Sequence, residues 1–122
     1  MRSHNAYRAL VNVLRLSAAE PWTQLAVIPD GTVKTDEIAL NLGETIDWAI
    51  SALSLPEHVV RLLRYIDSLL DAMSDRQELW SDQALISRSE WKVIRRESAL
   101  ALRLLGEDLG PPDLGWIKYV IS

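Results

Sequence analysis

The sequence predicts an all-α protein, a single-domain bundle of five or six helices that spans residues 1–122. Apolar residues recur at the three- and four-residue spacing of a helix face in several long segments. Proline and glycine stand mainly between those segments, where turns are expected. The chain contains no cysteine, which excludes disulfides, but it is long enough to bury a core without them.

The first helix is expected over residues 5–17, where apolar side chains share one face and Pro21 follows the end. Residues 22–34 carry a Pro-Asp-Gly turn signal and predict either a small hairpin or a helical turn followed by a loop. One variant of the fold adds a small β-ribbon that pairs residues 25–34 with the apolar, β-favouring C-terminal tail.

The next segment predicts two short helices, residues 36–42 and residues 45–54, with a turn between them. Thr35 suits an N-cap, and two acids follow it in the first turn. Gly43 supplies the residue that tolerates the left-handed conformation at a helix end.

The most regular helix begins after Pro56 and runs to about Met73. Asp67 and Asp71 lie four residues apart on its exposed face, a spacing that could hold a metal ion. Arg64 stands alongside them, which favours solvated acids instead. The apolar stripe of this helix consists of Val59, Leu62, Leu63, Ile66, Leu69, Leu70 and Met73.

The last third of the chain predicts a short helix within residues 75–86 and then a longer one. Ser87 and Glu90 have the spacing of a capping box at the start of the longer helix. That helix is expected to reach about Leu105, and Gly106 is expected to end it.

A stretch of small and apolar residues has the spacing of two short helices that cross at a steep angle. On this pattern, residues 6–54 resemble helix–turn–helix and winged-helix domains. The resemblance implies a turn at Gly43 and a second helix in the DNA major groove. The exposed positions of that second helix hold no Arg, Lys, Asn or Gln, and Pro56 opens a helix where a wing is expected. The residues that carry the resemblance are Ile38, Ala39, Leu42, Gly43, Ala49, Ala52 and Leu53.

Charge is distributed unevenly along the chain, whose formal net charge is −4. Residues 30–57 contain six acids and one base, whereas residues 88–103 contain five bases and two acids. Complementary charge governs association rate and partner choice more than affinity. An acidic contact surface is therefore expected at Asp36, Glu37, Glu44, Asp47 and Trp48, and an alternative basic surface at Arg88, Lys92, Arg95, Arg96 and Arg103.

No residue pattern indicates a catalytic, cofactor or metal site. The two histidines lack metal-ligand spacing, and neither a nucleophile motif nor a phosphate-binding loop occurs. We therefore predict a non-catalytic, acidic protein-binding protein, such as an inhibitor or immunity protein that masks a partner's cationic surface. The alternative is a helix–turn–helix-type DNA-binding regulator or a phage replication accessory factor. A homodimer that joins the acidic and basic surfaces is a third arrangement.

The expected location is the cytoplasm. Arg8 and Arg15 interrupt the N-terminal apolar stretch, unlike a signal peptide, and no run reaches the length of a membrane span. The absence of cysteine agrees with a reducing compartment.

Overall fold

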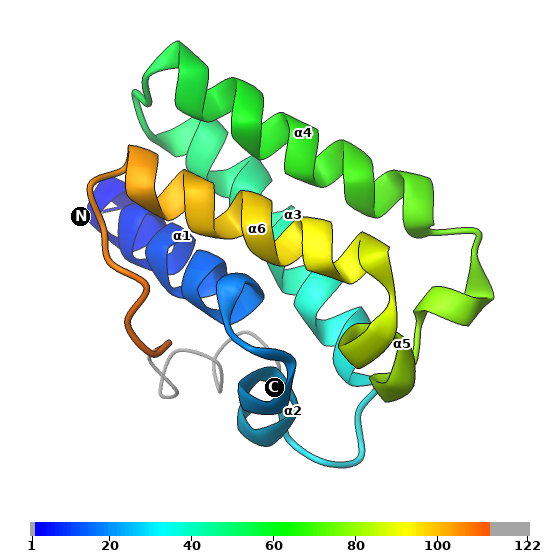
Figure 1. The fold of residues 1–122 in the computed structure, drawn as a ribbon. Helices are drawn as coiled ribbons and strands as arrows, with labels where there is room; N and C mark the ends of the chain where they lie inside the picture. Colours follow the sequence, from blue (N-terminus) through cyan, green and yellow to red (C-terminus); the bar gives the residue numbers. More distant parts are fainter. Residues whose placement is uncertain (1, 113–122) are drawn as a thin grey trace.

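The computed structural model of the protein describes residues 2–112 and contains only helical elements among them (Figure 1). The all-α prediction is therefore confirmed. The six α-helices and one short 3₁₀ helix are α1 (Arg2–Ala18), α2 (Pro21–Val27), α3 (Lys34–Ala52), α4 (Glu57–Met73), η1 (Gln77–Leu79), α5 (Asp82–Ser87) and α6 (Ser89–Leu104).

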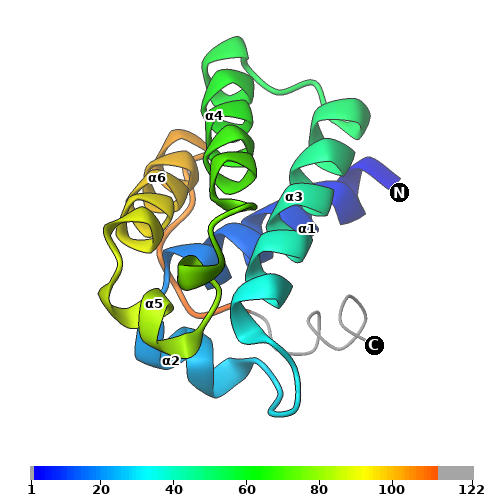
Figure 2. The same cartoon turned by 90° about the vertical axis from the view of Figure 1, so that its right-hand side faces the viewer.

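The four long helices form a closed ring in which each packs against two neighbours. Helix α1 contacts α3 and α6, and α4 contacts the same two helices on the other side of the ring. The short helices α2 and α5 contact each other at one end of this bundle (Figure 2). No helix of residues 2–112 is both long and apolar enough to cross a lipid bilayer.

The core lies at the centre of the ring and is built from one apolar face of each long helix. On α4, the predicted apolar stripe faces the core, and its residues Val59, Leu63 and Ile66 are fully buried. Full burial of such a side chain stabilises the fold by about 1.5–3 kcal/mol. The core also contains Leu10 and Leu14 of α1, and further members on α3, α5 and α6.

Two tryptophans join η1 to the core. Trp91 of α6 is completely buried, and its indole N–H donates to the carbonyl of Leu79 at 2.7 Å. Trp80 is half-buried, and its indole N–H donates to the carbonyl of Met73 at 2.9 Å. The two rings meet edge to face with centroids 5.5 Å apart. Both indole donors are thus satisfied, as buried indoles require.

The predicted turn at Gly43 is wrong, because α3 continues through this residue to Ala52. The glycines with positive φ among the described residues are Gly31 and Gly106. A glycine inside a helix costs only about 1 kcal/mol relative to alanine. The buried face of α3 runs on past Gly43 and outweighs that cost; it comprises Ile38, Leu42, Ile46 and Ala49.

Of the two alternatives predicted for residues 22–34, the helical turn followed by a loop is confirmed and the hairpin is wrong, so residues 25–34 form no β-ribbon. Helix α2 extends to Val27, and a turn follows in which Gly31 has φ +90°. Gln24 favours the helix because its side-chain amide donates to the carbonyls of Leu16 and Ser17 at the end of α1. The C-terminal half of the predicted ribbon lies outside the described residues.

The boundary between α5 and α6 differs from the prediction, whereas the end of α6 agrees with it. Ser87 is the last residue of α5, so the predicted capping box does not form. Glu90 instead forms an ion pair with Arg76. Gly106 ends α6 as predicted, with φ +76°, and the amides of Gly106 and Glu107 donate back to α6 carbonyls in a Schellman motif.

Candidate functional site

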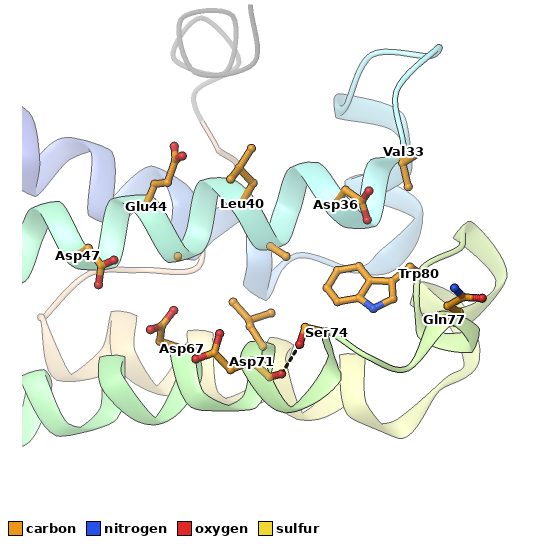
Figure 3. Close-up of a pocket in the computed structure, with 13 residues that line it drawn as sticks. Val33, Asp36, Leu40, Glu44, Asp47, Asp67, Asp71, Ser74, Gln77 and Trp80 are labelled. Carbon is orange, nitrogen blue, oxygen red and sulfur yellow. Dashed lines mark hydrogen bonds between the residues drawn. The ribbon is translucent and has the colours of Figure 1, made fainter.

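An open groove of about 880 Å³ runs between α3 and α4 (Figure 3). Its walls are one face of each helix, and η1 with the residue after it closes one end. We call it the acidic groove. It is lined by Val33, Asp36, Ala39, Leu40, Gly43, Glu44, Asp47, Asp67, Leu70, Asp71, Ser74, Gln77 and Trp80.

Five of the lining residues are carboxylates, and none of the lysines, arginines or histidines within residues 2–112 lines the groove. Seven ion pairs occur within residues 2–112, and all of them use acids outside the groove. The groove carboxylates therefore have no ion-pair partner in the described chain. They are Asp36, Glu44 and Asp47 from α3, and Asp67 and Asp71 from α4.

Helical spacing explains why these acids converge. Asp36, Gly43 and Asp47 recur at the spacing of one face of α3, and Asp67 and Asp71 lie one turn apart on α4. The two helices approach closely at Gly43, where a Cβ atom would lie 3.4 Å from Oδ1 of Asp67. Gly43 thus acts as a small residue between helices instead of as a turn.

Asp67 is the least exposed of the five carboxylates. Burial raises the pKa of its carboxyl group, and the negative charges of Asp47 and Asp71 raise it further, while Arg64 lowers it. Like charges near one another disfavour the ionised form in this way. A positive charge placed beside these carboxylates would offset their mutual repulsion.

The groove also has an apolar part. Ala39 and Leu70 are among the lining residues, and the ring of Trp80 lies at one end of the groove (Figure 3). Leu40 is 56% exposed at the rim. Acidic walls beside apolar surface suit a ligand that is both cationic and apolar, because the two attractions act on different parts of the same side chain.

The structure brings together three of the five residues predicted for the acidic contact surface. Asp36, Glu44 and Asp47 line the groove. Glu37 and Trp48 belong to α3 but are not part of the lining, and Trp48 is 37% exposed.

Sequence reasoning missed Trp80 and the second acidic wall. The spacing of Asp67 and Asp71 was visible, but it predicted nothing about the helix they face. Within residues 2–112, no group of three or more His, Cys, Asp or Glu side chains is arranged to hold a metal ion.

Four of the five residues predicted for the basic surface are exposed, and the fifth, Arg95, is not. Arg88, Lys92, Arg96 and Arg103 are exposed. Arg95 is half-buried and donates from Nη1 to the carbonyl of Leu85 at 2.9 Å, and burial lowers its pKa. It ties α6 to α5 and is not a free cation on that surface.

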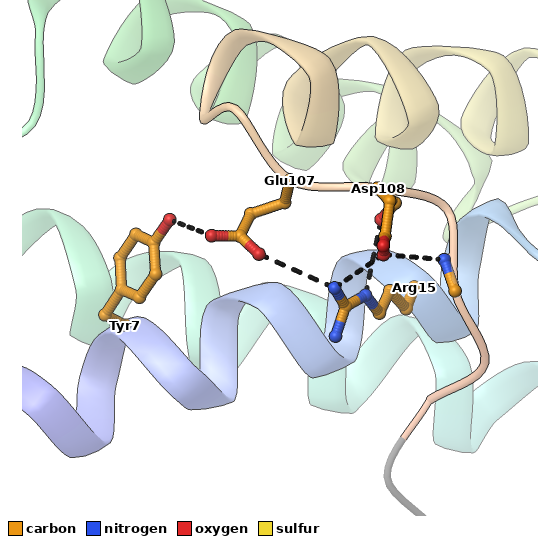
Figure 4. A network of polar contacts seen from close by, with 5 residues as sticks. Tyr7, Arg15, Glu107 and Asp108 are labelled. Atoms are coloured by element: carbon orange, nitrogen blue, oxygen red, sulfur yellow. Dashed lines mark hydrogen bonds and ion pairs between the residues drawn. The ribbon is translucent and has the colours of Figure 1, made fainter.

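A second polar cluster joins the segment after α6 to α1 (Figure 4). Tyr7 donates its hydroxyl to Glu107 at 2.7 Å, and Arg15 forms ion pairs with Glu107 and Asp108. Burial and this hydrogen bond raise the pKa of Tyr7 to about 12. The charged groups of this cluster already satisfy one another, so we assign it a structural role.

Comparison with models of known protein families, with curated proteins and with solved structures found no match to this chain.

Proposed function

We propose that this protein is a non-catalytic binding protein that receives a cationic surface of another protein in the acidic groove. An inhibitor or immunity protein that masks a basic active site in the cytoplasm would act in this way. The observation that carries the proposal is the presence of five carboxylates in one groove without an ion-pair partner in the described chain.

The physical basis is that a cationic partner neutralises charges that the fold leaves uncompensated. Two opposite unit charges 4 Å apart attract by about 1 kcal/mol in water and by about 4 kcal/mol at the effective dielectric constant of a protein surface. The negative electrostatic field of the groove also steers a basic partner toward it before contact, which raises the association rate at low ionic strength.

A second candidate function rests on the exposed cations of α6 and of Arg88, the residue that precedes this helix. Arg88, Lys92, Arg96 and Arg103 could contact the phosphates of DNA, as expected of a DNA-binding regulator or replication accessory factor.

The test measures binding of a Lys- and Arg-rich octapeptide and of a 20-base-pair random DNA duplex at two salt concentrations. We expect the peptide to bind and Asp36→Asn/Asp47→Asn/Asp71→Asn to weaken its binding by about 3- to 150-fold, since each exposed pair contributes about 0.2–1 kcal/mol.

The matched control neutralises three exposed acids outside the groove: Glu20→Gln/Asp75→Asn/Asp82→Asn. It changes the net charge equally and should leave most of the affinity. Equal losses in both triple variants would refute the groove as the site. Tight, salt-dependent DNA binding that Lys92→Glu/Arg96→Glu abolishes would favour the second function.

A further inference from the structure

Helices α4 and α6 lie side by side and antiparallel, so their outer faces meet along one junction (Figure 1). Arg76, which follows α4, forms an ion pair with Glu90 in the first turn of α6 and fixes the register of the two helices. Both helices rise by the same distance per residue, so Tyr65 of α4 is level with the second half of α6. The junction therefore joins the middle of α4 to the C-terminal part of α6.

Helical spacing places apolar side chains on both sides of this junction. Leu104 follows Glu90 by nearly whole turns and so shares the flank of α6 that faces α4, and Leu100 lies one turn before it. On α4, the flank toward α6 lies opposite Asp67, which faces Gly43 of α3. We call the apolar residues of the two facing flanks the α4–α6 seam: Leu62, Tyr65, Leu69, Leu100 and Leu104.

The seam has a partly buried floor and an exposed surface. Leu62 and Leu69 are partly buried and pack against the core. Tyr65, Leu100 and Leu104 are 48%, 37% and 40% exposed and do not belong to the core. A single exposed leucine is ordinary. Apolar side chains gathered along one helix junction instead offer a partner a surface that the fold itself does not use.

Cations border the seam on both helices. Arg61 lies one turn before Tyr65 on α4, and Arg96 and Arg103 lie two turns apart on the outer face of α6. Arg61 and Arg96 each pair with an exposed or neighbouring acid of their own helix. Arg103 forms no ion pair within residues 2–112. Surface pairs of this kind are weak, so the carboxylates of a partner can replace them.

The apolar seam and its cationic borders together select among three occupants. A second copy of this chain would place the same cations opposite one another, and like charges oppose that contact. Duplex DNA would neutralise the cations but leave the leucines in water. A helix with an apolar stripe between two acidic edges matches both features, because it packs between two neighbouring helices and meets the cations of each.

We propose that the α4–α6 seam binds an amphipathic helix of another protein, whose apolar stripe covers the seam and whose acidic edges lie beside Arg61, Arg96 and Arg103. This surface lies on the flank of α4 that faces away from the acidic groove, and it does not depend on the proposed function. The protein then holds an acidic helix on one side of α4 and a cationic ligand on the other.

The test measures the binding of a labelled acidic helix by fluorescence anisotropy. The probe is the peptide Ac-Glu-Leu-Glu-Ala-Leu-Leu-Gln-Glu-Leu-Glu-Ala-Leu-Leu-Gln-NH2, in which a leucine stripe at helical spacing lies between two glutamate edges. A second peptide has serine in place of each leucine, and a third has lysine in place of each glutamate. We expect the first peptide to bind and the serine peptide not to bind.

Two double variants separate the apolar and the charged contacts. Leu100→Ala/Leu104→Ala should weaken binding of the acidic peptide by about 10-fold, because both side chains lose apolar area that the peptide would cover. Arg96→Gln/Arg103→Gln should weaken it by about 2- to 30-fold, the range expected for two surface ion pairs. The fold should survive all four substitutions, since none of these side chains belongs to the core.

The matched controls change exposed side chains of the same kinds elsewhere. Val33→Ala/Leu40→Ala removes apolar surface from α3, and Arg8→Gln/Arg64→Gln removes two cations outside the seam. Both control variants should keep the affinity for the acidic peptide within about 2-fold of wild type.

The outcomes are distinct. Binding that falls in the two seam variants and stays in the controls would support the proposal. Equal binding of the serine peptide, or no binding of the acidic peptide at low salt, would overturn it. So would a dimer in analytical ultracentrifugation that Leu100→Ala/Leu104→Ala disperses, or DNA binding that only Arg96→Gln/Arg103→Gln abolishes. The lysine peptide tests the acidic groove, so its binding without that of the acidic peptide would overturn the seam alone.

Discussion

Replacement of Asp67 by asparagine should stabilise the folded protein and weaken its binding of cations. The carboxylate of Asp67 is partly buried and lies near two other negative charges, which raises its pKa. An amide of nearly the same shape removes the charge. One pKa unit corresponds to about 1.4 kcal/mol, but solvent screens this site, so we expect a gain of about 0.5 kcal/mol in the free energy of unfolding at pH 7. For a chain of this length, that gain raises Tm by about 2 °C.

The pH dependence provides the sharper check. Since the folded pKa of Asp67 is higher than its unfolded value, its favourable contribution is complete below the ordinary pKa of 3.8 and is lost as the pH rises through the folded pKa. The difference between Asp67→Asn and wild type should therefore be small at pH 3.5 and should reach its full value at pH 7. Urea unfolding, monitored by tryptophan fluorescence, measures the free energy of unfolding of each protein at the two pH values.

Asp75→Asn is the matched control, because Asp75 is exposed and does not line the groove. We expect its free energy of unfolding to change by less than about 0.5 kcal/mol. If Asp67→Asn were less stable than wild type at pH 7, or if its advantage did not depend on pH, the repulsion inferred for the groove would be refuted.

Three further predictions test helix continuity and structural contacts instead of the charges of the acidic groove. Gly43→Ala should stabilise the protein by about 0.5–1 kcal/mol because this glycine lies within a helix. Gly106→Ala should destabilise it by about 1 kcal/mol because φ at this position is positive. Chemical denaturation of both variants tests whether α3 is continuous, since a turn at Gly43 would make the first substitution destabilising as well. Arg95→Ala should cost about 1–2 kcal/mol through the lost bond to a backbone carbonyl, and Arg96→Ala less than about 0.5 kcal/mol; equal values in thermal unfolding would contradict the structural role of Arg95. The stability contributed by Tyr7 is complete below pH 10 and is lost as the pH rises toward 12, so Tyr7→Phe should show a smaller fall in unfolding free energy between pH 9 and pH 11.5.

The sequence predicts helices well where a buried stripe and a terminating residue agree. Val59, Leu63 and Ile66 define α4 through local spacing alone, and Gly106 marks the end of α6 through its own conformational freedom. At Gly43 two local signals conflict. The glycine suggests a turn, while the apolar face continues on either side, and only the packing of α3 against α1 and α4 decides in favour of the helix.

The candidate site was predictable on one wall only. Asp36 and Asp47 were visible as part of an acidic segment, but nothing local indicates that α4 presents Asp67 and Asp71 to the same groove. The role of Arg95 likewise depends on the carbonyl of Leu85, ten residues earlier in the chain. Its charge alone therefore suggested an exposed cation of the basic surface. Side-chain spacing within one helix is local information, whereas the helix it faces is a property of the whole fold.

Both walls of the acidic groove come from consecutive helices, joined by the short segment of residues 53–56. The lining of the acidic groove thus comes from one contiguous stretch, residues 33–80, while α1 and α6 form the opposite side of the ring. Exposed positions of that stretch could be exchanged as a cassette to redirect the protein toward other ligands, with the scaffold on the far side left unaltered. Such grafting would make the molecule a compact starting point for engineered binders.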